Sequence, residues 1–238
     1  MPHSLNSLQS YAGVRATVLG LGRFGGGVAA AEFLAERGAV VTVTDTRTAE
    51  ELSESMATLA EVDIKRFALG AHPPEVFDDC QLLVVNPAVK PTSPHVERCR
   101  QAGTIITSEI EIFLHHCRAK VVAITGSNGK STTAALTRHL LERDSRRSFL
   151  GGNIGTSLLP VVDDITSDDV VVLELSSFQL HYLRGASFAP DVAIVTNFAA
   201  NHLDWHGDTE AYHAAKQVLL NRQSRTQVAT MPDDFLIN

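Results

Sequence analysis

Lys130 and Ser131 lie in the stretch of this sequence that is best suited to phosphate chemistry. From Val121 to Thr133 the chain reads VVAITGSNGKSTT, an apolar β-forming run followed by a glycine-bounded turn and a hydroxyl-rich helix start. Backbone N–H groups and the positive end of a helix dipole converge at such a turn and favour an anion. The lysine adds a mobile positive charge, and the serine hydroxyl suits Mg²⁺. We therefore predict an ATP site formed by Gly126, Ser127, Asn128, Gly129, Lys130, Ser131 and Thr132.

The loop departs from the strict phosphate-loop pattern, which would place a glycine where the chain has Ile124. The alternative is an ordinary glycine-rich turn with a surface lysine. A lysine followed by three hydroxyl residues at the start of an apolar-faced helix favours the phosphate interpretation.

Two further strands carry chemically capable residues at their ends. DVVVLELSSFQL predicts a buried strand ending in Glu174, and PDVAIVTN predicts another, followed by His202. Ligands of parallel α/β sheets bind at the carboxyl ends of strands. Ser131 and Glu174 offer oxygen ligands to Mg²⁺, whereas a histidine is a less usual ligand. The spacing His202-x-Asp204-x-His206 could suggest zinc, but it gives no clear tetrahedral set. These residues predict phosphoryl transfer or phosphate-driven ligation.

The elements around these residues predict a second domain, residues 119–238, with a doubly wound parallel sheet of the P-loop ATPase type. Residues 143–148 are expected to form a solvated connection, and 163–169 an acidic surface loop. GGNIGTSLL is expected to run from strand to helix, with Asn153 near the helix start.

Residues 1–118 predict a Rossmann-like first domain. Gly20, Gly22 and Gly25 match G-x-G-x-x-G between a strand and a helix, and a second strand ends at Asp45, where an acid normally receives a ribose. The adjacent glycines at 26 and 27 are interpreted as packing residues. Further strands are expected within 66–72, 80–89 and 104–107, with a helix in 91–103. His115, His116 and Cys117 are interpreted as an exposed helix end rather than a metal cluster.

Composition excludes several classes of protein. The chain has 238 residues, a net charge of −7 and 44% hydrophobic residues, so it lacks the basic balance of a nucleic-acid surface. No apolar run reaches membrane-spanning length, and the first residues lack the pattern of a signal peptide. Three scattered cysteines indicate neither a disulfide framework nor a zinc knuckle. We expect a cytoplasmic protein without membrane insertion.

Five motifs in order carry a family resemblance that covers essentially the whole chain. TGSNGKSTT, GGNIG, LELSSFQL, TNFAANHLDWHG and AYHAAK resemble the Mur ligases of peptidoglycan synthesis, and LELSSFQL with GLGRFG is most similar to their D-glutamate-adding branch. The resemblance implies a first domain that holds UDP-MurNAc-L-Ala rather than a dinucleotide. It also implies that ATP phosphorylates the L-alanyl carboxylate and that the amine of D-glutamate attacks the acyl phosphate. A monomer is expected.

The resemblance assigns roles to individual residues. It implies uridine and diphosphate contacts at Arg23, Phe24, Asp45, Thr46, Ala88 and Asn153, and sugar–peptide contacts at Ser176 and Gln179. It implies catalytic roles for Lys130, His202 and Lys216, and Mg²⁺ ligation by Ser131, Glu174, His202 and a carbamylated Lys216. A desolvated lysine has a lowered pKa and can react with CO₂ in its neutral form. From spacing alone, the lysine in HAAKQVL would be interpreted as a helix-surface residue.

The sequence also departs from the family pattern. Phe24 replaces a small hydroxyl residue, the loop NPAV containing Ala88 replaces an SPG-type loop, and Trp205 stands where arginine is usual. The family continues into a D-glutamate-binding domain, so the chain is expected to carry the first domain and most of the central one. Three alternatives remain open: a non-catalytic nucleotide-sugar-binding protein, an NAD-dependent dehydrogenase, and a folylpolyglutamate-type or other Mur ligase.

Overall fold

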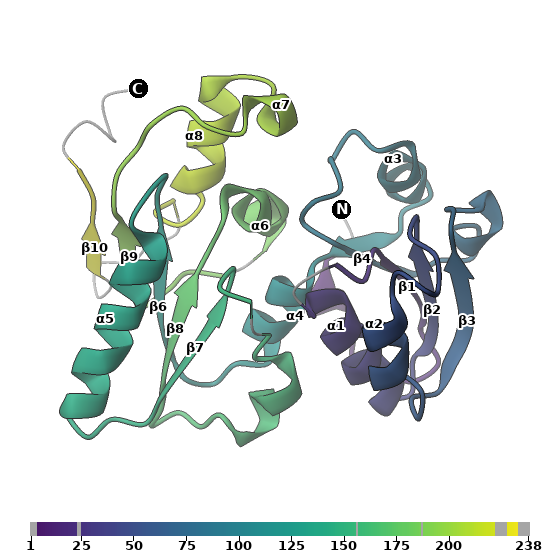
Figure 1. The fold of residues 1–238 in the computed structure, drawn as a ribbon, viewed down its shortest axis with the longest axis horizontal. Coiled ribbons are helices and arrows are strands. Elements are labelled where there is room, and N and C mark those ends of the chain that lie inside the picture. The colour runs from purple at the N-terminus through teal and green to yellow at the C-terminus, as the bar shows by residue number, and fades with distance from the viewer. Residues whose placement is uncertain (1–3, 23–24, 156, 187, 222–227, 233–238) are drawn as a thin grey trace. The chain divides into compact units, whose positions relative to one another are not determined.

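The computed structural model describes residues 4–22, 25–155, 157–186, 188–221 and 228–232. The chain forms two compact units, Met1–His115 and His116–Asn238 (Figure 1). Each unit alternates parallel strands with helices, so the α/β fold class predicted from the sequence is confirmed. No helix in the described part of the chain has both the length and the apolar character needed to cross a lipid bilayer.

The first unit is built on five parallel strands. They are β1 (Arg15–Leu19), β2 (Val40–Asp45), β3 (Ile64–Leu69), β4 (Leu82–Val85) and β5 (Ile105–Thr107), in the spatial order β3-β2-β1-β4-β5. The central strand β1 pairs with β2 on one side and with β4 on the other. Chain connections on the two sides of β1 therefore run in opposite directions, and right-handed crossovers then place helices on opposite faces of the sheet.

Helices alternate with the strands in the described part of the first unit. They are α1 (Gly26–Glu36), α2 (Ser53–Thr58), α3 (Pro94–Gln101) and α4 (Glu109–His116), with 3₁₀ helices η1 (Leu5–Ser7) and η2 (Pro74–Val76). A Cβ on Gly27 would lie 2.5 Å from the backbone oxygen of Gly20, so this glycine is the packing residue that was predicted. Gly26 has only ordinary contacts, because its nearest neighbour would be Glu109 at 3.7 Å.

The second unit also contains five parallel strands. They are β6 (Lys120–Thr125), β7 (Ser148–Gly152), β8 (Val170–Glu174), β9 (Val192–Val195) and β10 (Val228–Thr230), in the order β10-β9-β6-β8-β7. The central strand β6 pairs Ile124 with Glu174 of β8 and Thr125 with Val195 of β9. The loops that follow β6, β8 and β9 therefore start side by side at one edge of this sheet.

Helices cover the sheet of the second unit, and its interior strands β6 and β8 are the most deeply buried. The helices are α5 (Lys130–Arg143), α6 (Ser177–Tyr182), α7 (Leu203–His206) and α8 (Thr209–Gln217), with 3₁₀ helices η3 (Leu159–Asp164) and η4 (Leu183–Gly185). All five residues of β8 are buried. Ile124, Ala134 and Val172 join β6, α5 and β8 in one apolar core.

Three local expectations for the second unit are wrong. Ser148 starts strand β7 rather than ending a solvated connection. Asn153 lies in a turn directly after that strand, and the next helical element is the 3₁₀ helix that begins at Leu159. In the acidic segment, Asp169 is 4% exposed and accepts hydrogen bonds from the backbone N–H and hydroxyl of Thr166. A short aspartate can fold back on its own turn in this way, which charge alone does not indicate.

Candidate functional site

The phosphate loop connects β6 to α5 through two glycines that no other residue could replace without strain. Gly126 has φ +146°, and a Cβ there would lie 1.9 Å from Thr196 Oγ1. Gly129 has φ +79° and caps the start of α5. The first helical bond runs from Thr133 N to Gly129 O. The N–H groups of Lys130, Ser131 and Thr132 precede it, so they lack helical acceptors and can face an anion.

The Lys130 side chain bends back over this loop. Its Nζ donates to the carbonyl oxygens of Gly126 and Ser127, each at 3.0 Å. The ammonium group is thus held within the loop by weak neutral acceptors. A phosphate oxygen would be a stronger acceptor, because it carries a negative charge that attracts the ammonium group, whereas a carbonyl oxygen is neutral.

Ser131 and Glu174 meet across the carboxyl ends of β6 and β8. The Ser131 hydroxyl donates to Glu174 Oε2 at 2.6 Å, and Asn153 Nδ2 donates to Glu174 Oε1 at 2.9 Å. Glu174 is 2% exposed. The backbone at the end of β7 can approach the backbone of Glu174 closely only because residue 152 is glycine. A Cβ on Gly152 would lie 2.2 Å from Glu174 O. These contacts orient both oxygens of a buried carboxylate.

Lys216 on α8 is buried beside the same loop, with 1% of its surface exposed. Its Nζ donates to Gly126 O at 2.9 Å and to Thr125 Oγ1 at 3.2 Å. Burial, assisted by the positive charge of Lys130, lowers the pKa of Lys216 to about 7. The interpretation of this residue as a helix-surface lysine is wrong.

His202 lies between β9 and α7, whereas Ser131 lies on α5 and Glu174 ends β8. His202 is exposed, caps α7 with φ +53°, and its ring centroid lies 4.8 Å from that of Phe178. A non-glycine residue in the left-handed region is strained, and such strain is often found at functional sites. Across the described residues, no group of three or more His, Cys, Asp or Glu side chains is arranged to hold a metal ion. The zinc interpretation therefore gains no support.

Trp205, which stands where the family usually has arginine, forms part of an aromatic cluster on α6 and α7. Its ring lies 4.8 Å from Phe178 and 4.6 Å from His206. His206 Nε2 is 2.9 Å from Ser177 Oγ. Burial, with the nearby charges of His202, Arg184 and Lys216, lowers the pKa of His206 to about 4. His206 is therefore a neutral residue that links α7 to α6.

Residues after β9 clamp the phosphate loop, and the sequence reasoning missed them. Asn197 Oδ1 accepts from Asn128 N and its Nδ2 donates to Asn128 O, both at 2.9 Å. Asn197 O also accepts from Ser127 N, and Thr196 Oγ1 donates to Asn128 O at 2.6 Å. The signal was available, because both residues end the stretch PDVAIVTN, which was predicted as a strand that reaches the ligand-binding edge.

Ser176 and Gln179, predicted to face the substrate, bind each other at the start of α6. Ser176 Oγ accepts from Gln179 N at 3.2 Å, and Gln179 Oε1 accepts from Ser176 N at 3.0 Å. This reciprocal arrangement is a capping box, whose S-x-x-Q signature is present in the sequence.

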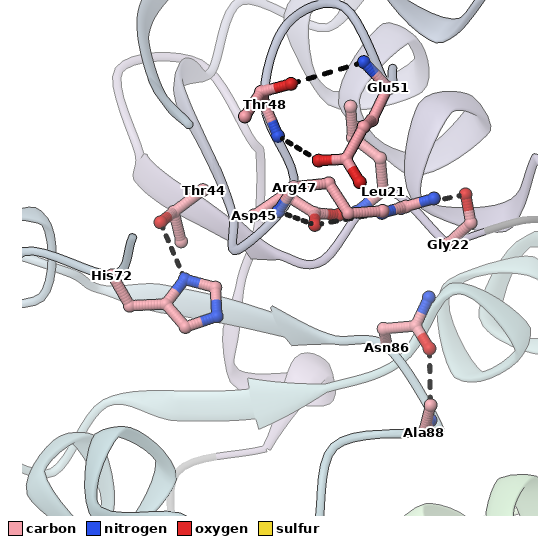
Figure 2. Close-up of polar contacts among 10 residues, drawn as sticks. All are labelled: Leu21, Gly22, Thr44, Asp45, Arg47, Thr48, Glu51, His72, Asn86 and Ala88. Atoms are coloured by element: carbon pink, nitrogen blue, oxygen red, sulfur yellow. Dashed lines mark hydrogen bonds and ion pairs between the residues drawn. The ribbon is translucent and has the colours of Figure 1, made fainter. Parts of the chain in front are cut away.

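In the first unit, Asp45 ends β2 and accepts hydrogen bonds from nearby donors (Figure 2). Its carboxylate accepts from Leu21 N at 2.9 Å, from Arg47 N at 3.0 Å, and from Arg47 Nη2 at 2.8 Å. Burial opposes the charge, but the hydrogen bonds and charge of Arg47 and the Leu21 N–H hold the pKa of Asp45 below its usual value. Asp45 thus fixes the glycine turn after β1 to the end of β2.

Asn86 fills the space that the glycine turn leaves open. A Cβ on Gly22 would lie 2.4 Å from Asn86 Nδ2, and Asn86 Oδ1 accepts from Ala88 N at 3.0 Å (Figure 2). Thr46 and Ala88 are exposed beside these strand ends. The predicted contacts at Arg23 and Phe24 lie outside the described residues.

Two families of domain sequences match the chain in succession. Residues 14–108 match the Mur ligase MurD-like N-terminal domain, and residues 124–237 match the Mur ligase middle domain. The chain belongs to the Mur ligase family, as its motifs predict.

Two curated relatives of this chain share the name of one kind of ligase. The protein of Roseiflexus sp. (strain RS-1) is 42% identical over 212 residues, covering 89% of this chain and 45% of the relative. That of Acidobacterium capsulatum is 41% identical over 225 residues, covering 94% of this chain and 46% of the relative. Both are named UDP-N-acetylmuramoylalanine--D-glutamate ligase. The chain spans about half the length of these curated relatives.

Solved structures share the fold at lower identity. The UDP-N-acetylmuramate:L-alanyl-gamma-D-glutamyl-meso-diaminopimelate ligase from Neisseria meningitides has a TM-score of 0.61 at 20% identity, covering 95% of this chain and 74% of that chain. The UDP-N-acetylmuramate-alanine ligase from Thermotoga maritima has a TM-score of 0.55 at 23% identity, covering 93% of this chain and 50% of that chain.

Proposed function

We propose that this chain carries the nucleotide-sugar-binding and ATP-binding parts of a ligase that joins D-glutamate to UDP-MurNAc-L-Ala. The observation that carries the proposal is the phosphate loop with Lys130, Lys216 and the Ser131–Glu174 pair around it. The names of the curated relatives support the D-glutamate specificity. Because the reaction consumes ATP, we assign it to the cytoplasm. We also propose that the protein acts as a monomer.

The phosphate loop would hold the triphosphate of ATP. The N–H groups at the start of α5 are free to donate to an anion. Lys130 can exchange the carbonyl oxygens of Gly126 and Ser127 for phosphate oxygens. This exchange replaces neutral acceptors by charged ones. Lys130 would then stabilise the negative charge that builds up on the transferred phosphoryl group.

The residues beside the loop suit Mg²⁺. A serine hydroxyl and a buried carboxylate already meet at 2.6 Å, and both are hard oxygen ligands. Asn153 would keep the Glu174 carboxylate oriented while Ser131 turns its oxygen lone pairs to the cation. The exposed His202 is proposed as a further ligand, consistent with its strained backbone. Bound Mg²⁺ would neutralise phosphate charge.

Lys216 has the environment that carbamylation requires. A pKa of about 7 leaves much of the amine neutral near neutral pH, and only the neutral amine can attack CO₂. Attack forms an N–C bond and releases a proton, and the product is an anionic carbamate that retains one N–H donor. That N–H could still bind Gly126 O, while the new oxygens provide a negative charge for a cation.

The first unit would bind the UDP part of the substrate at the ends of β1, β2 and β4. Asp45 and Thr46 are the proposed uracil contacts, and the glycine turn offers backbone N–H groups to the diphosphate. Asp45 holds that turn through Leu21 N, so one residue would both shape the site and contact the base. Ala88, Asn153, Ser176 and Gln179, with Arg23 and Phe24, remain proposed substrate contacts.

The reaction follows from bringing three groups together. The L-alanyl carboxylate would attack the γ-phosphorus of ATP, so the acyl phosphate forms and ADP leaves. The neutral amine of D-glutamate would then attack the acyl carbon, so the amide bond forms, phosphate leaves and the amine loses a proton. Positioning and charge neutralisation account for the catalysis, since no side-chain nucleophile is needed.

Calorimetric titration with UDP-MurNAc-L-Ala and with MgATP tests the two binding assignments separately. Product formation from all three substrates, followed by mass, tests ligation. The proposal is supported if the chain binds both ligands. It is contradicted if the chain binds neither of them. Binding of the nucleotide sugar but not of ATP would favour the alternative, a non-catalytic nucleotide-sugar-binding protein.

A further inference from the structure

The short helix α7, which follows His202, contributes little to its own attachment. It has four residues, and none of them is buried, although all lie within the described part of the chain. His202 precedes it in the left-handed conformation, with φ 53° and ψ 34°. The carbonyl of His202 accepts from Trp205 N at 3.1 Å and from His206 N at 3.0 Å, so residues 202–206 form one segment. The position of this segment must therefore be set by contacts with another element.

Phe178 on α6 packs against both ends of the segment. Its ring centroid lies 4.8 Å from that of His202, 4.8 Å from that of Trp205 and 5.6 Å from that of His206. The His206 ring is stacked on Phe178, with 14° between the planes, and the other two rings are tilted. Aromatic rings attract each other in such offset and tilted arrangements when their centroids are about 4.5–7 Å apart. The Phe178 ring therefore supports the His202 imidazole directly.

Other contacts also attach α7 to α6. His206 Nε2 lies 2.9 Å from Ser177 Oγ, and Trp205 packs on two further rings of α6. These contacts do not involve Phe178, so they remain when its side chain is shortened. We therefore expect α7 to stay on α6 without the Phe178 ring, while the His202 imidazole loses its support.

Phe178 is itself fixed relative to Glu174, which ends β8 just before α6. Leu175 N donates to Ile124 O at 2.8 Å, and Leu175 O accepts from Thr125 Oγ1 at 2.8 Å. The chain that leaves β8 is thus attached to β6, and a capping box then starts α6. The backbone between Glu174 and Phe178 is held at both ends of this short connection.

We propose that Phe178 is a positioning residue, which places the His202 imidazole relative to Glu174 so that both can bind the Mg²⁺ of MgATP. The inference rests on the proposed function, in which both side chains are metal ligands. An exposed histidine loses conformational freedom when it binds a metal, and this loss weakens binding. Packing on Phe178 removes part of that freedom before the metal arrives. Neighbours that orient a metal ligand raise metal affinity in this way.

The Mg²⁺ dependence of ATP binding by the 238-residue chain tests this role. Calorimetry gives the Kd for ATP over a series of Mg²⁺ concentrations in the natural sequence, Phe178→Leu, His202→Ala and the double variant. In Phe178→Leu, the Mg²⁺ concentration that gives half of the full effect should rise about 10-fold. ATP affinity without Mg²⁺ should not change. In the His202→Ala background, Phe178→Leu should have no further effect, because it acts through His202. Additive effects of the two substitutions would overturn the proposal.

The same four proteins distinguish failure of this inference from failure of the proposed function. If His202→Ala does not change the Mg²⁺ requirement, His202 is not a ligand, and the inference falls with that assignment. If His202→Ala raises the requirement and Phe178→Leu does not, the role of Phe178 alone is overturned.

Two further variants and an NMR measurement complete the test. Phe178→Tyr keeps the ring and should keep the natural Mg²⁺ requirement. Phe149→Leu removes a partly buried ring from β7 and is the matched control. The Hε1 resonance of His202, identified by its loss in His202→Ala, should shift in ligand-free Phe178→Leu because a ring current is removed. It should not shift in Phe149→Leu. An unchanged resonance in Phe178→Leu would overturn the proposal, since Phe178 would then not support the imidazole.

Discussion

Lys130 and Lys216 donate to the same carbonyl oxygen, Gly126 O, at 3.0 and 2.9 Å. Two positive groups on one acceptor repel each other, and the repulsion is strongest where water is excluded. Lys216 is the more buried of the two lysines, so the repulsion disfavours the charged form of Lys216 more than that of Lys130. Burial is the main cause of its lowered pKa, and the charge of Lys130 is the second.

Lys216 should make the stability of the chain depend on pH. Below its folded pKa of about 7, both states carry the proton and the folded state bears the full cost of burying the charge. Between that value and the unfolded pKa of about 10.4, the unfolded chain binds the proton and the folded chain does not, so stability rises with pH. We therefore expect the free energy of unfolding of Lys216→Met, compared with that of the natural sequence, to be most favourable near pH 7, at the low end of this window.

Urea unfolding in bicarbonate-free buffer measures this difference at several pH values. The exposed Lys120→Met is the matched control for the loss of a lysine from the same unit. A difference for Lys216→Met that does not change with pH would mean that the buried lysine does not titrate as the structure indicates.

Local sequence patterns were enough to predict the phosphate loop and the strand–turn–helix at Gly20–Gly25. In both, neighbouring residues determine the backbone: apolar runs form buried parallel strands, and glycines adopt positive φ at the turn. The strand ends at Glu174 and Asp45 were predicted for the same reason.

Contacts between distant segments could not be predicted in this way. Lys216 looks like a surface residue because its helix is short and mixed, and only the packing of α8 beside Gly126 buries it. The turn at Asn153 was interpreted as a helix start because glycine-rich turns precede both strands and helices.

Gly27→Ala should destabilise the first unit through a backbone clash. The added Cβ would lie 2.5 Å from both Gly20 O and Leu21 Cα, and backbone atoms cannot move aside as a side chain can. We expect a loss of about 1–3 kcal/mol in the free energy of unfolding, measured in urea, as for other overpacked sites. Gly26→Ala is the control, since its nearest neighbour would be 3.7 Å away, and it should be neutral or stabilising. Equal effects at both positions would contradict this account.

Asp45→Ala should weaken both the fold and the binding of UDP-MurNAc-L-Ala. Its removal leaves Leu21 N and the Arg47 guanidinium without their carboxylate partner, which should cost about 1–3 kcal/mol of stability. Because Asp45 has a lowered pKa, its contribution is present above the unfolded pKa and is lost as pH falls through the folded value. Calorimetry and urea unfolding measure the two effects, with the exposed Asp63→Ala as control. Unchanged affinity at a ligand concentration that keeps the variant folded would exclude a uracil contact.

Ser131→Ala should reduce the affinity for MgATP while leaving the fold intact. The hydroxyl is on the exposed first turn of α5, and its one protein acceptor is the Glu174 carboxylate. Losing one such contact corresponds to about a 5- to 30-fold increase in Kd, measured by calorimetry. Ser148→Ala on β7 should not change the affinity. An unchanged Kd for Ser131→Ala, with Mg²⁺ present, would argue against this serine as a metal ligand.

Asn197→Ala should weaken MgATP binding although the residue need not touch the nucleotide. Its side-chain amide satisfies both the N–H and the carbonyl of Asn128, so it holds the phosphate loop in one conformation before the ligand arrives. Without it, part of the binding energy is spent on ordering the loop, and we expect Kd to rise about 5- to 30-fold. Asn197→Asp should bind less well still, because a carboxylate would face Asn128 O and the phosphates. The exposed Asn221→Ala serves as the control for general effects on the second unit. Normal MgATP affinity in Asn197→Ala, together with a lowered melting temperature, would show that the clamp serves the fold and not the site.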